Sequence, residues 1–215
     1  MAAAPIYLAS ASPRRRELLA QIGVRHEVRP VDLDESRLPG ERPSDYVQRL
    51  ALAKAEAAWQ RFAAAENRPV LAADTAVVLD DKVLGKPRDR QDGFAMLQLL
   101  SGRTHEVLTA VALRDARGID SRLNGSRVTF RALRPGEIEA YWHTGEPADK
   151  AGAYAVQGYA AVFIERLEGS FSAVMGLPLF ETAELLERAG VHAWEPRPFA
   201  RTSAIAETGC QESPA

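Results

Sequence analysis

The segment LASASPRRRELL, residues 8–19, places three consecutive arginines, Arg14, Arg15 and Arg16, where a helix should begin. The first turn of a helix already has unpaired N–H groups and a partial positive charge, so acidic residues are expected there and arginines are unfavourable. A bound phosphate would make the arrangement favourable, because the helix N–H groups, two guanidinium groups and the hydroxyls of Ser10 and Ser12 would all donate to it. These residues therefore predict a site for an anion such as the phosphates of a nucleotide.

A structural explanation of the same arginines is also open. They could be solvated, or they could pair with acidic side chains such as Glu17. We expect this of Arg16, and we expect Arg14 and Arg15 to bind phosphate.

Asp74 is the second unusual residue, because it stands within the apolar run VLAADTAVVL. An ionised carboxylate is costly to bury there unless a cation accompanies it. We expect Asp74 to be a metal ligand or general base at the end of a central strand, where the sites of α/β proteins usually open. The alternative is a carboxylate that caps a turn at a strand end. Thr75 would add a hydroxyl to the same pocket.

Further charged side chains could complete such a site. Lys54 recurs on the inner face of its predicted helix, where a lysine is rare without an anion, although it could also extend to solvent. Lys86 in LGKP lies between a glycine and a proline, which fix its backbone direction, although a lysine in a turn could simply face solvent. The loop VDLDES carries Asp32, Asp34 and Glu35, which either bind Mg²⁺ or Mn²⁺ or are only solvated.

Together these groups are what the hydrolysis of a phosphoanhydride requires: cations for the polyphosphate, carboxylates for a divalent ion, and a base that activates water. Neither the GxxxxGK[ST] nor the GxGxxG phosphate-binding motif occurs in the sequence. The four histidines are scattered and, with a single cysteine, give no spacing typical of zinc sites. Any catalytic metal is therefore expected to be held by carboxylates.

The composition is that of a globular chain with a substantial core. Its 215 residues suit one domain, or one domain with two lobes, and 46% of them are hydrophobic. The net charge of -2 and the lack of an aromatic-basic stripe argue against nucleic acid and anionic membranes as partners. No stretch is long enough to span a bilayer, and the first residues lack the layout of a signal peptide. With only one cysteine, Cys210, these features favour a cytoplasmic protein.

Hydrophobic periodicity predicts alternating helices and strands that do not repeat as βαβ units, so we expect an α/β fold with a mixed sheet. Helices are expected over 13–22, 44–65, 89–100, from 135 onward and over 177–190, and strands over 6–9, 69–79, 104–114, 121–132 and after the loop that begins at 151. From about Ala193 the chain is rich in Pro, Ser, Glu and Thr and lacks periodicity, so residues 193–215 are expected to form a disordered tail.

Seven segments, in order, resemble the Maf family of nucleoside triphosphate pyrophosphatases. They are LASASPRRRELL, VDLDES, RLALAKA, AADTAVVLDDKVLGKP, LSGRTHEVLTAVAL, DKAGAYAVQG and EGSFSAVMGLPL. The resemblance covers nearly the whole chain and implies one Maf-like domain over residues 1–192. It implies an elongated mixed β-sheet with flanking helices and two lobes around a central cleft, related to inosine triphosphate pyrophosphatases. It also implies a homodimer.

The resemblance implies a reaction and roles for the residues. Water attacks the α-phosphate of a nucleoside triphosphate in the presence of a divalent metal cation, Mg²⁺ or Mn²⁺, and the products are the monophosphate and pyrophosphate. Asp74 matches the proton acceptor of the family. The phosphate site is matched by Ser10, Arg14, Arg15, Lys54 and Lys86, of which the two lysines are expected to be catalytic. Glu35, together with Asp74, is expected to bind the metal.

Three positions resemble the branch of the family that acts on dTTP and UTP: Arg14 after SP, Thr75 after the aspartate and Gln157 in AVQG. The branch that acts on 7-methyl-GTP tends to carry tryptophan, glutamine and glutamate there. An amide offers a donor and an acceptor, which match the N3–H and O4 edge of uracil or thymine, whereas a carboxylate favours the donor edge of guanine. Alternatively, Gln157 could be a loop amide that satisfies its own backbone.

The expected function is therefore hydrolysis of dTTP and UTP, and of modified pyrimidine nucleotides, in the cytoplasm. The alternative is a regulator of cell division that binds nucleotides without needing to hydrolyse them. An intact aspartate beside a full set of cations argues against the regulator, because a sensor needs no base.

Overall fold

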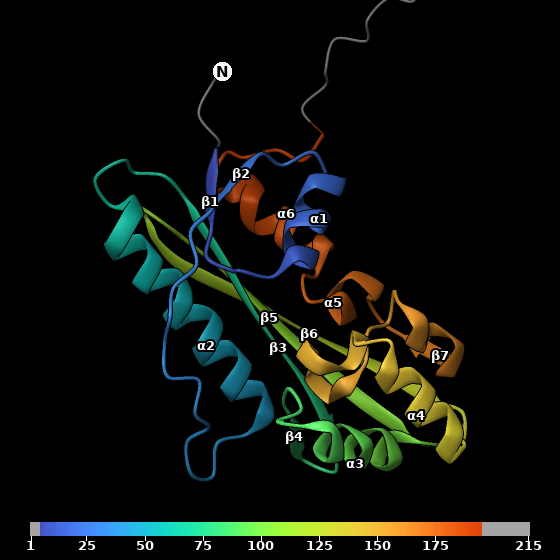
Figure 1. The fold of residues 1–215 in the computed structure, drawn as a ribbon. Coiled ribbons are helices and arrows are strands. Elements are labelled where there is room, and N and C mark those ends of the chain that lie inside the picture. Colours follow the sequence, from blue (N-terminus) through green and yellow to red (C-terminus); the bar gives the residue numbers. More distant parts are fainter. Residues whose placement is uncertain (1–4, 195–215) are drawn as a thin grey trace, which may run out of the picture.

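The structure is a computed structural model that describes residues 5–194. The predicted disordered tail, residues 193–215, lies outside the described residues from 195 onward, so it stays a prediction. The described chain forms a seven-stranded mixed sheet with flanking helices (Figure 1), as the sequence predicted.

The strands of this sheet are β1 (Ile6–Leu8), β2 (His26–Val28), β3 (Val70–Leu79), β4 (Lys82–Leu84), β5 (Thr104–Asp115), β6 (Gly118–Phe130) and β7 (Ile164–Glu168). Their order is β2-β1-β3-β5-β6-β7, and β4 pairs with β3. β1 is parallel to β2 and β3, whereas all other pairs are antiparallel. The three long strands β3, β5 and β6 run the length of the molecule (Figure 1) and carry the rest of the fold.

One face of the sheet is covered by α2 (Pro43–Ala58), which continues into a π-helical turn, η1 (Trp59–Ala63). The inward residues of α2 recur at helical spacing and are buried; they are Val47, Leu50, Ala51, Lys54, Ala55 and Ala58. Half of them are alanines, which lets the helix pack close to β3 and β5. Lys54 lies on this inner stripe, as the periodicity predicted.

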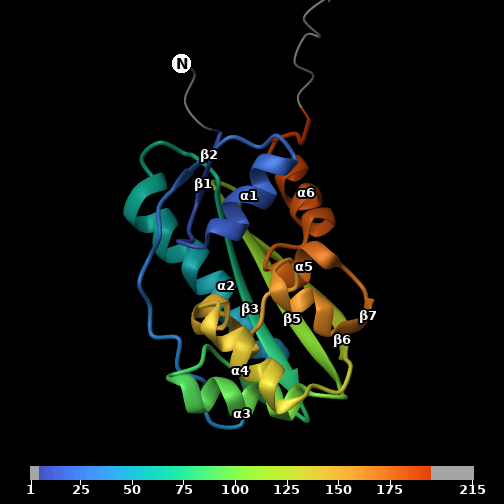
Figure 2. The same cartoon turned by 45° about the vertical axis from the view of Figure 1, so that its right-hand side comes forward.

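The opposite face carries two groups of helices (Figure 2), which form the two lobes. At one end lie α1 (Pro13–Gln21) and α6 (Leu179–Arg188), and at the other lie α3 (Arg90–Leu100), α4 (Pro135–His143) and the 3₁₀ turns η2 (Glu146–Asp149), η3 (Ala151–Ala153) and η4 (Tyr159–Phe163). Each group has its own apolar core, one around Leu19 and Leu185 and one around Leu97 and Phe130. The short helix α5 (Phe171–Met175), which the sequence did not predict, contacts β5, β6 and α1.

The start of α1 has the predicted form. Pro13 is its first residue, and its first turn contains no acidic side chain. Ser12 stands before it with extended backbone, but its hydroxyl caps no helix N–H group. The N–H group of Ser12 instead donates to Ser10 Oγ at 3.2 Å. The cationic first turn of the helix therefore has no negative partner within its own segment.

Candidate active site

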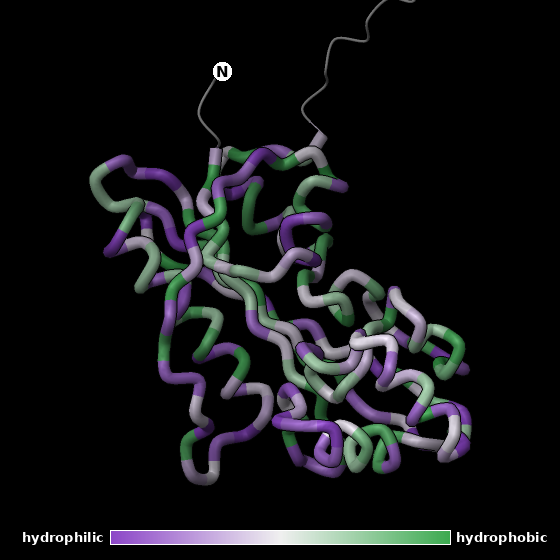
Figure 3. Tube along the Cα trace, in the orientation of Figure 1, coloured by the Kyte–Doolittle hydropathy of each residue, from purple (hydrophilic) through white to green (hydrophobic). Residues whose placement is uncertain are grey.

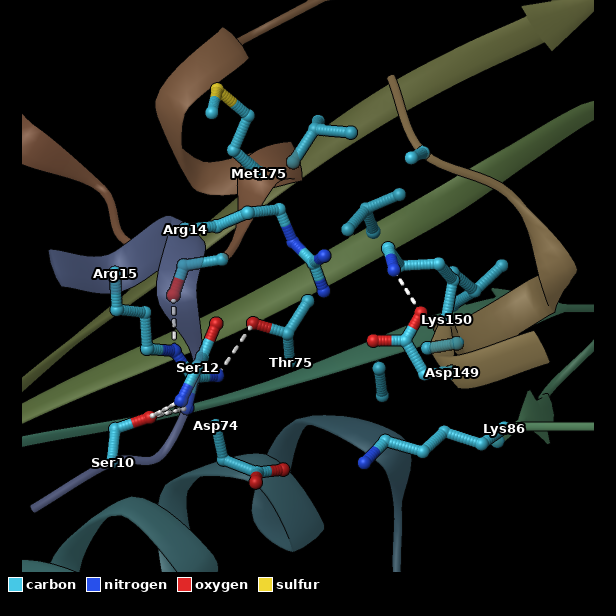
Figure 4. Close-up of a pocket in the computed structure, with 18 of the residues that line it drawn as sticks. Ser10, Ser12, Arg14, Arg15, Asp74, Thr75, Lys86, Asp149, Lys150 and Met175 are labelled. Carbon is cyan, nitrogen blue, oxygen red and sulfur yellow. Dashed lines mark hydrogen bonds and ion pairs between the residues drawn. The ribbon is translucent and has the colours of Figure 1, made fainter. Parts of the chain in front are cut away.

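A cavity of about 640 Å³ opens beside the middle of β3 (Figure 4). All nine site residues predicted from the sequence line it: Ser10, Arg14, Arg15, Glu35, Lys54, Asp74, Thr75, Lys86 and Gln157. Its volume is in the range of pockets that bind small ligands and cofactors. The arginines of the amino-terminal helix and the acid of the apolar strand therefore meet in one place.

The cavity lies where one edge of β3 has no neighbouring strand. β1 pairs with β3 only at Val70 and Leu71, and β4 pairs with it from Val77 onward. Between these points no described strand covers that edge. Because side chains alternate along a strand, Asp74 points toward α2 while Thr75 points to the opposite face. A ligand at the open edge would meet side chains from both faces of the sheet.

Asp74 lies in the middle of β3, so the prediction that it stands at the end of a strand was wrong. That prediction used a rule for parallel sheets, whose strands share one carboxyl edge. Here β3 is antiparallel to β4 and β5, and its ends share no such edge. The alternative in which Asp74 caps a turn at a strand end is wrong for the same reason.

Asp74 and Lys54 form a buried ion pair, with 2.7 Å between Lys54 Nζ and Asp74 Oδ1. Both residues are less than one tenth exposed, at 7% and 8%. The same ammonium lies 2.6 Å from Glu35 Oε1. Lys54 therefore does not extend to solvent, and its charge holds two carboxylates at the mouth of the cavity.

The environment of Asp74 makes it a stronger proton acceptor than an exposed carboxylate. Burial raises the pKa of the Asp74 carboxyl, and the nearby carboxylate of Glu35 adds to the rise. The charges of Lys54 and Arg15 act in the opposite direction and offset part of the rise. A buried base with a raised pKa suits the abstraction of a proton from water.

Glu35 is exposed, but the loop that carries it is held in place. This loop, between β2 and α2, is largely hydrophilic (Figure 3). The hydroxyl of Tyr46 donates to the carbonyl of Glu35 at 3.0 Å, and Arg49 Nη2 donates to the carbonyl of Ser36 at 3.1 Å. Both donors belong to α2. The loop is thus fixed along the same helix that supplies Lys54.

Arg15 connects three parts of the chain around the cavity. Its Nε donates to the carbonyl of Gly176 at 2.8 Å, Nη1 to Ser10 Oγ at 3.1 Å and Nη2 to Thr75 Oγ1 at 3.3 Å. Ser10 Oγ also accepts the N–H of Ser12, so its own O–H remains available to a ligand. The side chain of Arg15 therefore positions the Ser10 and Thr75 hydroxyls.

Arg14 is in a different situation from its neighbour. Within residues 5–194 it makes no hydrogen bond or ion pair, and its side chain extends across the cavity (Figure 4). A partly buried guanidinium with no bonded acceptor in the described chain is available to an incoming anion. Arg16 is exposed and does not line the cavity, as expected.

Lys86 and Gln157 lie on loops at the other side of the cavity. Lys86 is exposed, and its side chain extends toward Asp74 (Figure 4). Gln157 lies between η3 and η4 and is also exposed. Its amide makes no hydrogen bond with any other residue that the structure describes, so it does not satisfy its own loop backbone. Both residues line the cavity and are open to solvent.

Asp149 and Lys150 also line the cavity (Figure 4), although no pattern in the sequence singled them out. The Lys150 ammonium pairs with the Asp149 carboxylate, and the lysine side chain is only 13% exposed. Both belong to the segment DKAGAYAVQG, which supported the family resemblance. A lysine in an irregular loop belongs to no periodic pattern in the sequence. Its place in the cavity therefore becomes visible only in the folded chain.

Glu35 and Asp74 are the candidate ligands of a divalent cation, because they flank the one ammonium of Lys54. In the part of the chain that the structure describes, no group of three or more histidine, cysteine, aspartate or glutamate side chains could hold a metal. Mg²⁺, however, is commonly bound by one or two carboxylates plus substrate phosphates. The two carboxylates fit a cation of that kind. Asp32 and Asp34 do not line the cavity.

The fold and the cavity define an α/β protein with a cleft suited to a polyanion. The chain belongs to the Maf family: the family described as Maf-like protein matches residues 5–189. A dTTP/UTP pyrophosphatase of Alkalilimnicola ehrlichii is 57% identical over 185 residues, which cover 85% of this chain and 91% of the relative. A dTTP/UTP pyrophosphatase of Saccharophagus degradans is 54% identical over 194 residues, or 89% and 92% of the two chains.

A solved structure, a dITP/XTP pyrophosphatase from Mycobacterium abscessus, is a remote match. It superposes with a TM-score of 0.39 at 18% identity and covers 65% of this chain and 93% of its own. Among the described helices, none has the length and apolar character needed to cross a membrane.

Proposed function

We propose that the protein is a nucleoside triphosphate pyrophosphatase that hydrolyses dTTP and UTP to the monophosphate and pyrophosphate. The observation that carries the proposal is the joint position of Arg14 and the buried Lys54–Asp74 pair on one cavity. The names of the relatives, which share more than half of their aligned residues with this chain, support the choice of substrate.

The triphosphate would lie against the first turn of α1. Arg14 and Lys86 line the cavity and form no ion pair within the described chain, and the Ser10 hydroxyl is free to donate to the same ligand. The N–H groups at the start of α1 add partial positive charge. This arrangement would neutralise a polyphosphate, and the proposed reaction requires its α-phosphate to lie at the β3 edge beside Asp74.

Asp74 would accept a proton from the attacking water. The water oxygen then forms a bond to the α-phosphorus, and the bond from this phosphorus to the oxygen bridging to the β-phosphate breaks. Pyrophosphate leaves with that electron pair. Lys54 orients the Asp74 carboxylate at 2.7 Å, and Lys86 would neutralise charge that develops on the phosphates.

We also propose that Glu35 and Asp74 hold a divalent cation, Mg²⁺ or Mn²⁺, during the reaction. When bound, such a cation neutralises phosphate oxygens and polarises the scissile phosphate. The proposal of a metal site is supported by the two carboxylates, Glu35 and Asp74, that lie beside the ammonium of Lys54.

Gln157 and Thr75 would read the base. The Gln157 amide has no hydrogen-bond partner in the described chain, and a uracil or thymine edge offers it one acceptor and one donor. Cytosine presents the reverse pattern at these two positions, so the amide would need to flip to accept it. A preference for uracil or thymine therefore requires that the amide be held in one orientation when the nucleotide is bound.

The test is pyrophosphate release from a panel of nucleoside triphosphates with Mg²⁺ or Mn²⁺. The proposal expects dTTP and UTP to be preferred over CTP and the purine triphosphates. Equal turnover of ATP or GTP would remove the claim of specificity. Binding of UTP without release of pyrophosphate would instead support a nucleotide-binding regulator.

A homodimer, a location in the cytoplasm and a lack of nucleic-acid binding are further parts of the proposal. They follow from the family resemblance and from the composition. Light scattering on the purified chain would test the first, and a gel-shift assay with DNA and RNA the last.

A further inference from the structure

The backbone on both sides of Gln157 is held by two side chains that do not line the cavity, Tyr141 and Glu146. We call this pair the loop clamp. Tyr141 belongs to α4 and is 4% exposed, while Glu146 is the first residue of η2. Neither lines the cavity. Any effect of the clamp on a ligand must therefore act through the residues that it holds.

The hydrogen bonds of the clamp reach both ends of the segment. The N–H of Ala155 donates to the Tyr141 hydroxyl at 3.3 Å, and that hydroxyl donates to Glu146 Oε1 at 2.7 Å. Glu146 Oε2 accepts the N–H of Tyr159 at 3.0 Å, and Oε1 accepts the N–H of Ala160 at 3.3 Å. The fixed N–H groups thus stand before and after Gln157.

The turn packs directly on the carboxylate of the clamp. A Cβ placed on Gly158 would lie 2.0 Å from Glu146 Oε2. Gly158 has a negative φ of -107°, so the glycine is needed for space rather than for backbone conformation. The carboxylate and the turn therefore fit only when residue 158 has no side chain.

The clamp is itself rigid. The Tyr141 ring packs edge-on against Phe163, with ring centroids 5.3 Å apart. Burial raises the pKa of the Tyr141 hydroxyl, so it remains a donor to Glu146. The turn around Gln157 has a single backbone hydrogen bond of its own, from Gly158 to Ala155 at 3.1 Å. Val156 and Ala160, on either side of the turn, are also buried in the core around Leu97 and Phe130, so the clamp adds hydrogen-bonding constraint to a turn whose flanks are held by packing.

We propose that Glu146, held by Tyr141, is a positioning residue that sets the preference for a uracil or thymine base by fixing the backbone around Gln157. The inference rests on the proposed function. A base-reading amide must be held close to its productive geometry to discriminate, and an exposed side chain on an irregular loop obtains that constraint from the backbone. Loss of the clamp should therefore cost discrimination more than chemistry.

The experiment measures kcat and KM for UTP and CTP by pyrophosphate release. The variants are Glu146→Ala, Glu146→Gln, Gly158→Ala and Gln157→Ala, and the double variant Glu146→Ala with Gln157→Ala. The matched control is Glu139→Ala, which removes an exposed glutamate of α4 outside the clamp. Thermal unfolding checks that each variant is folded, and Glu146→Gln and Gly158→Ala provide the readout if Glu146→Ala does not fold.

In Glu146→Ala and Gly158→Ala we expect the UTP-to-CTP ratio of kcat/KM to fall about tenfold, mainly through a higher KM for UTP. Glu146→Gln keeps an acceptor oxygen and should retain an intermediate ratio. In the Gln157→Ala background, Glu146→Ala should not change the ratio further.

The inference is overturned if Glu146→Ala keeps the wild-type ratio or lowers the kcat/KM of both nucleotides equally. A further loss of the ratio in the Gln157→Ala background would also overturn it. If the wild-type protein itself does not prefer UTP over CTP, the proposed specificity fails and the inference fails with it. These outcomes separate failure of the clamp from failure of the proposed function.

Discussion

The ammonium of Lys54 lies 2.7 Å from the carboxylate of Asp74, and both side chains are buried beside the open edge of β3. The pair explains how an ionised carboxylate can stand in the middle of an apolar strand, because an isolated charge there would be too costly. It also explains why an alanine-rich inner face of α2 contains a lysine. The relationship joins two segments that the sequence presents separately.

The three arginines of α1 should separate by function. Arg14→Ala should raise KM for UTP about tenfold with little change in stability, because Arg14 bonds no described residue. Arg15→Ala should lower the free energy of unfolding by about 2 kcal/mol, since three hydrogen bonds of a charged group are lost. Steady-state kinetics and urea unfolding measure both effects.

Arg16→Ala is the control for both changes, because Arg16 is exposed and lies outside the cavity. It should alter neither KM nor stability. If Arg14→Ala and Arg16→Ala behave alike, the assignment of Arg14 to the phosphates is wrong.

Glu35 should control the affinity for the divalent cation. Glu35→Gln should raise the concentration of Mg²⁺ or Mn²⁺ needed for half-maximal activity about tenfold, because one of two ionised ligands is lost. Asp34→Asn is the matched control from the same loop, since Asp34 does not line the cavity. Metal titrations of pyrophosphate release, with a chelator-treated sample as the zero point, measure the effect. An equal shift in both variants would contradict the assignment.

His105 should make the protein less stable in acid. Burial lowers its pKa from 6.5 to about 4, and its Nε2 is 2.8 Å from the Tyr154 hydroxyl. The unfolded chain therefore takes up the proton first. The free energy of unfolding keeps its full value above pH 6.5, and it decreases by about 3 kcal/mol as the pH falls toward 4.

The measurement for His105 is urea unfolding of the wild type and His105→Leu at several pH values. Between pH 6.5 and 4, the free energy of unfolding should change less steeply with pH in His105→Leu than in the wild type. His143→Gln, which changes an exposed histidine of α4, should keep the wild-type slope. The same slope in all three proteins would show that His105 does not carry the effect.

Gly93 should resist substitution although it lies inside a helix. A Cβ there would be 2.3 Å from Cζ3 of Trp142, so Gly93→Ala should force α3 and α4 apart and cost about 2 kcal/mol. Gly136→Ala, in α4, meets no atom within 4 Å and should be neutral or slightly stabilising. Thermal unfolding of the two variants compares the same substitution at a helix position packed against a side chain and at a helix position that faces solvent.

The sequence predicted most of the elements because their hydrophobic patterns are local. The stripe of α2 and the apolar run of β3 each contain their own signal. The short α5 was missed, because a five-residue helix has too few residues for a periodic pattern. The nine site residues came from local charge anomalies and from the family resemblance, and the structure brings all of them to one cavity.

What could not be predicted depends on contacts between distant segments. Asp74 was placed at a strand end because the pattern of one strand does not reveal where its neighbours stop. Three N–H groups of Arg15 donate to Ser10, Thr75 and Gly176, the last of which is 161 positions away in the chain, and phosphate binding by its remaining donors stays a prediction. The loop clamp at Glu146 depends in the same way on a turn formed later in the sequence.

The most direct test of the central claim, that Asp74 activates water in a site which binds the triphosphate separately, is the variant Asp74→Asn. Calorimetric titration of UTP with Mg²⁺ gives its Kd, and pyrophosphate release gives its kcat. At Mg²⁺ concentrations that saturate the variant as well as the wild type, the account predicts a kcat lower by about a thousandfold and a Kd within about threefold of the wild-type KM. A variant that turns over UTP at the wild-type rate would contradict it.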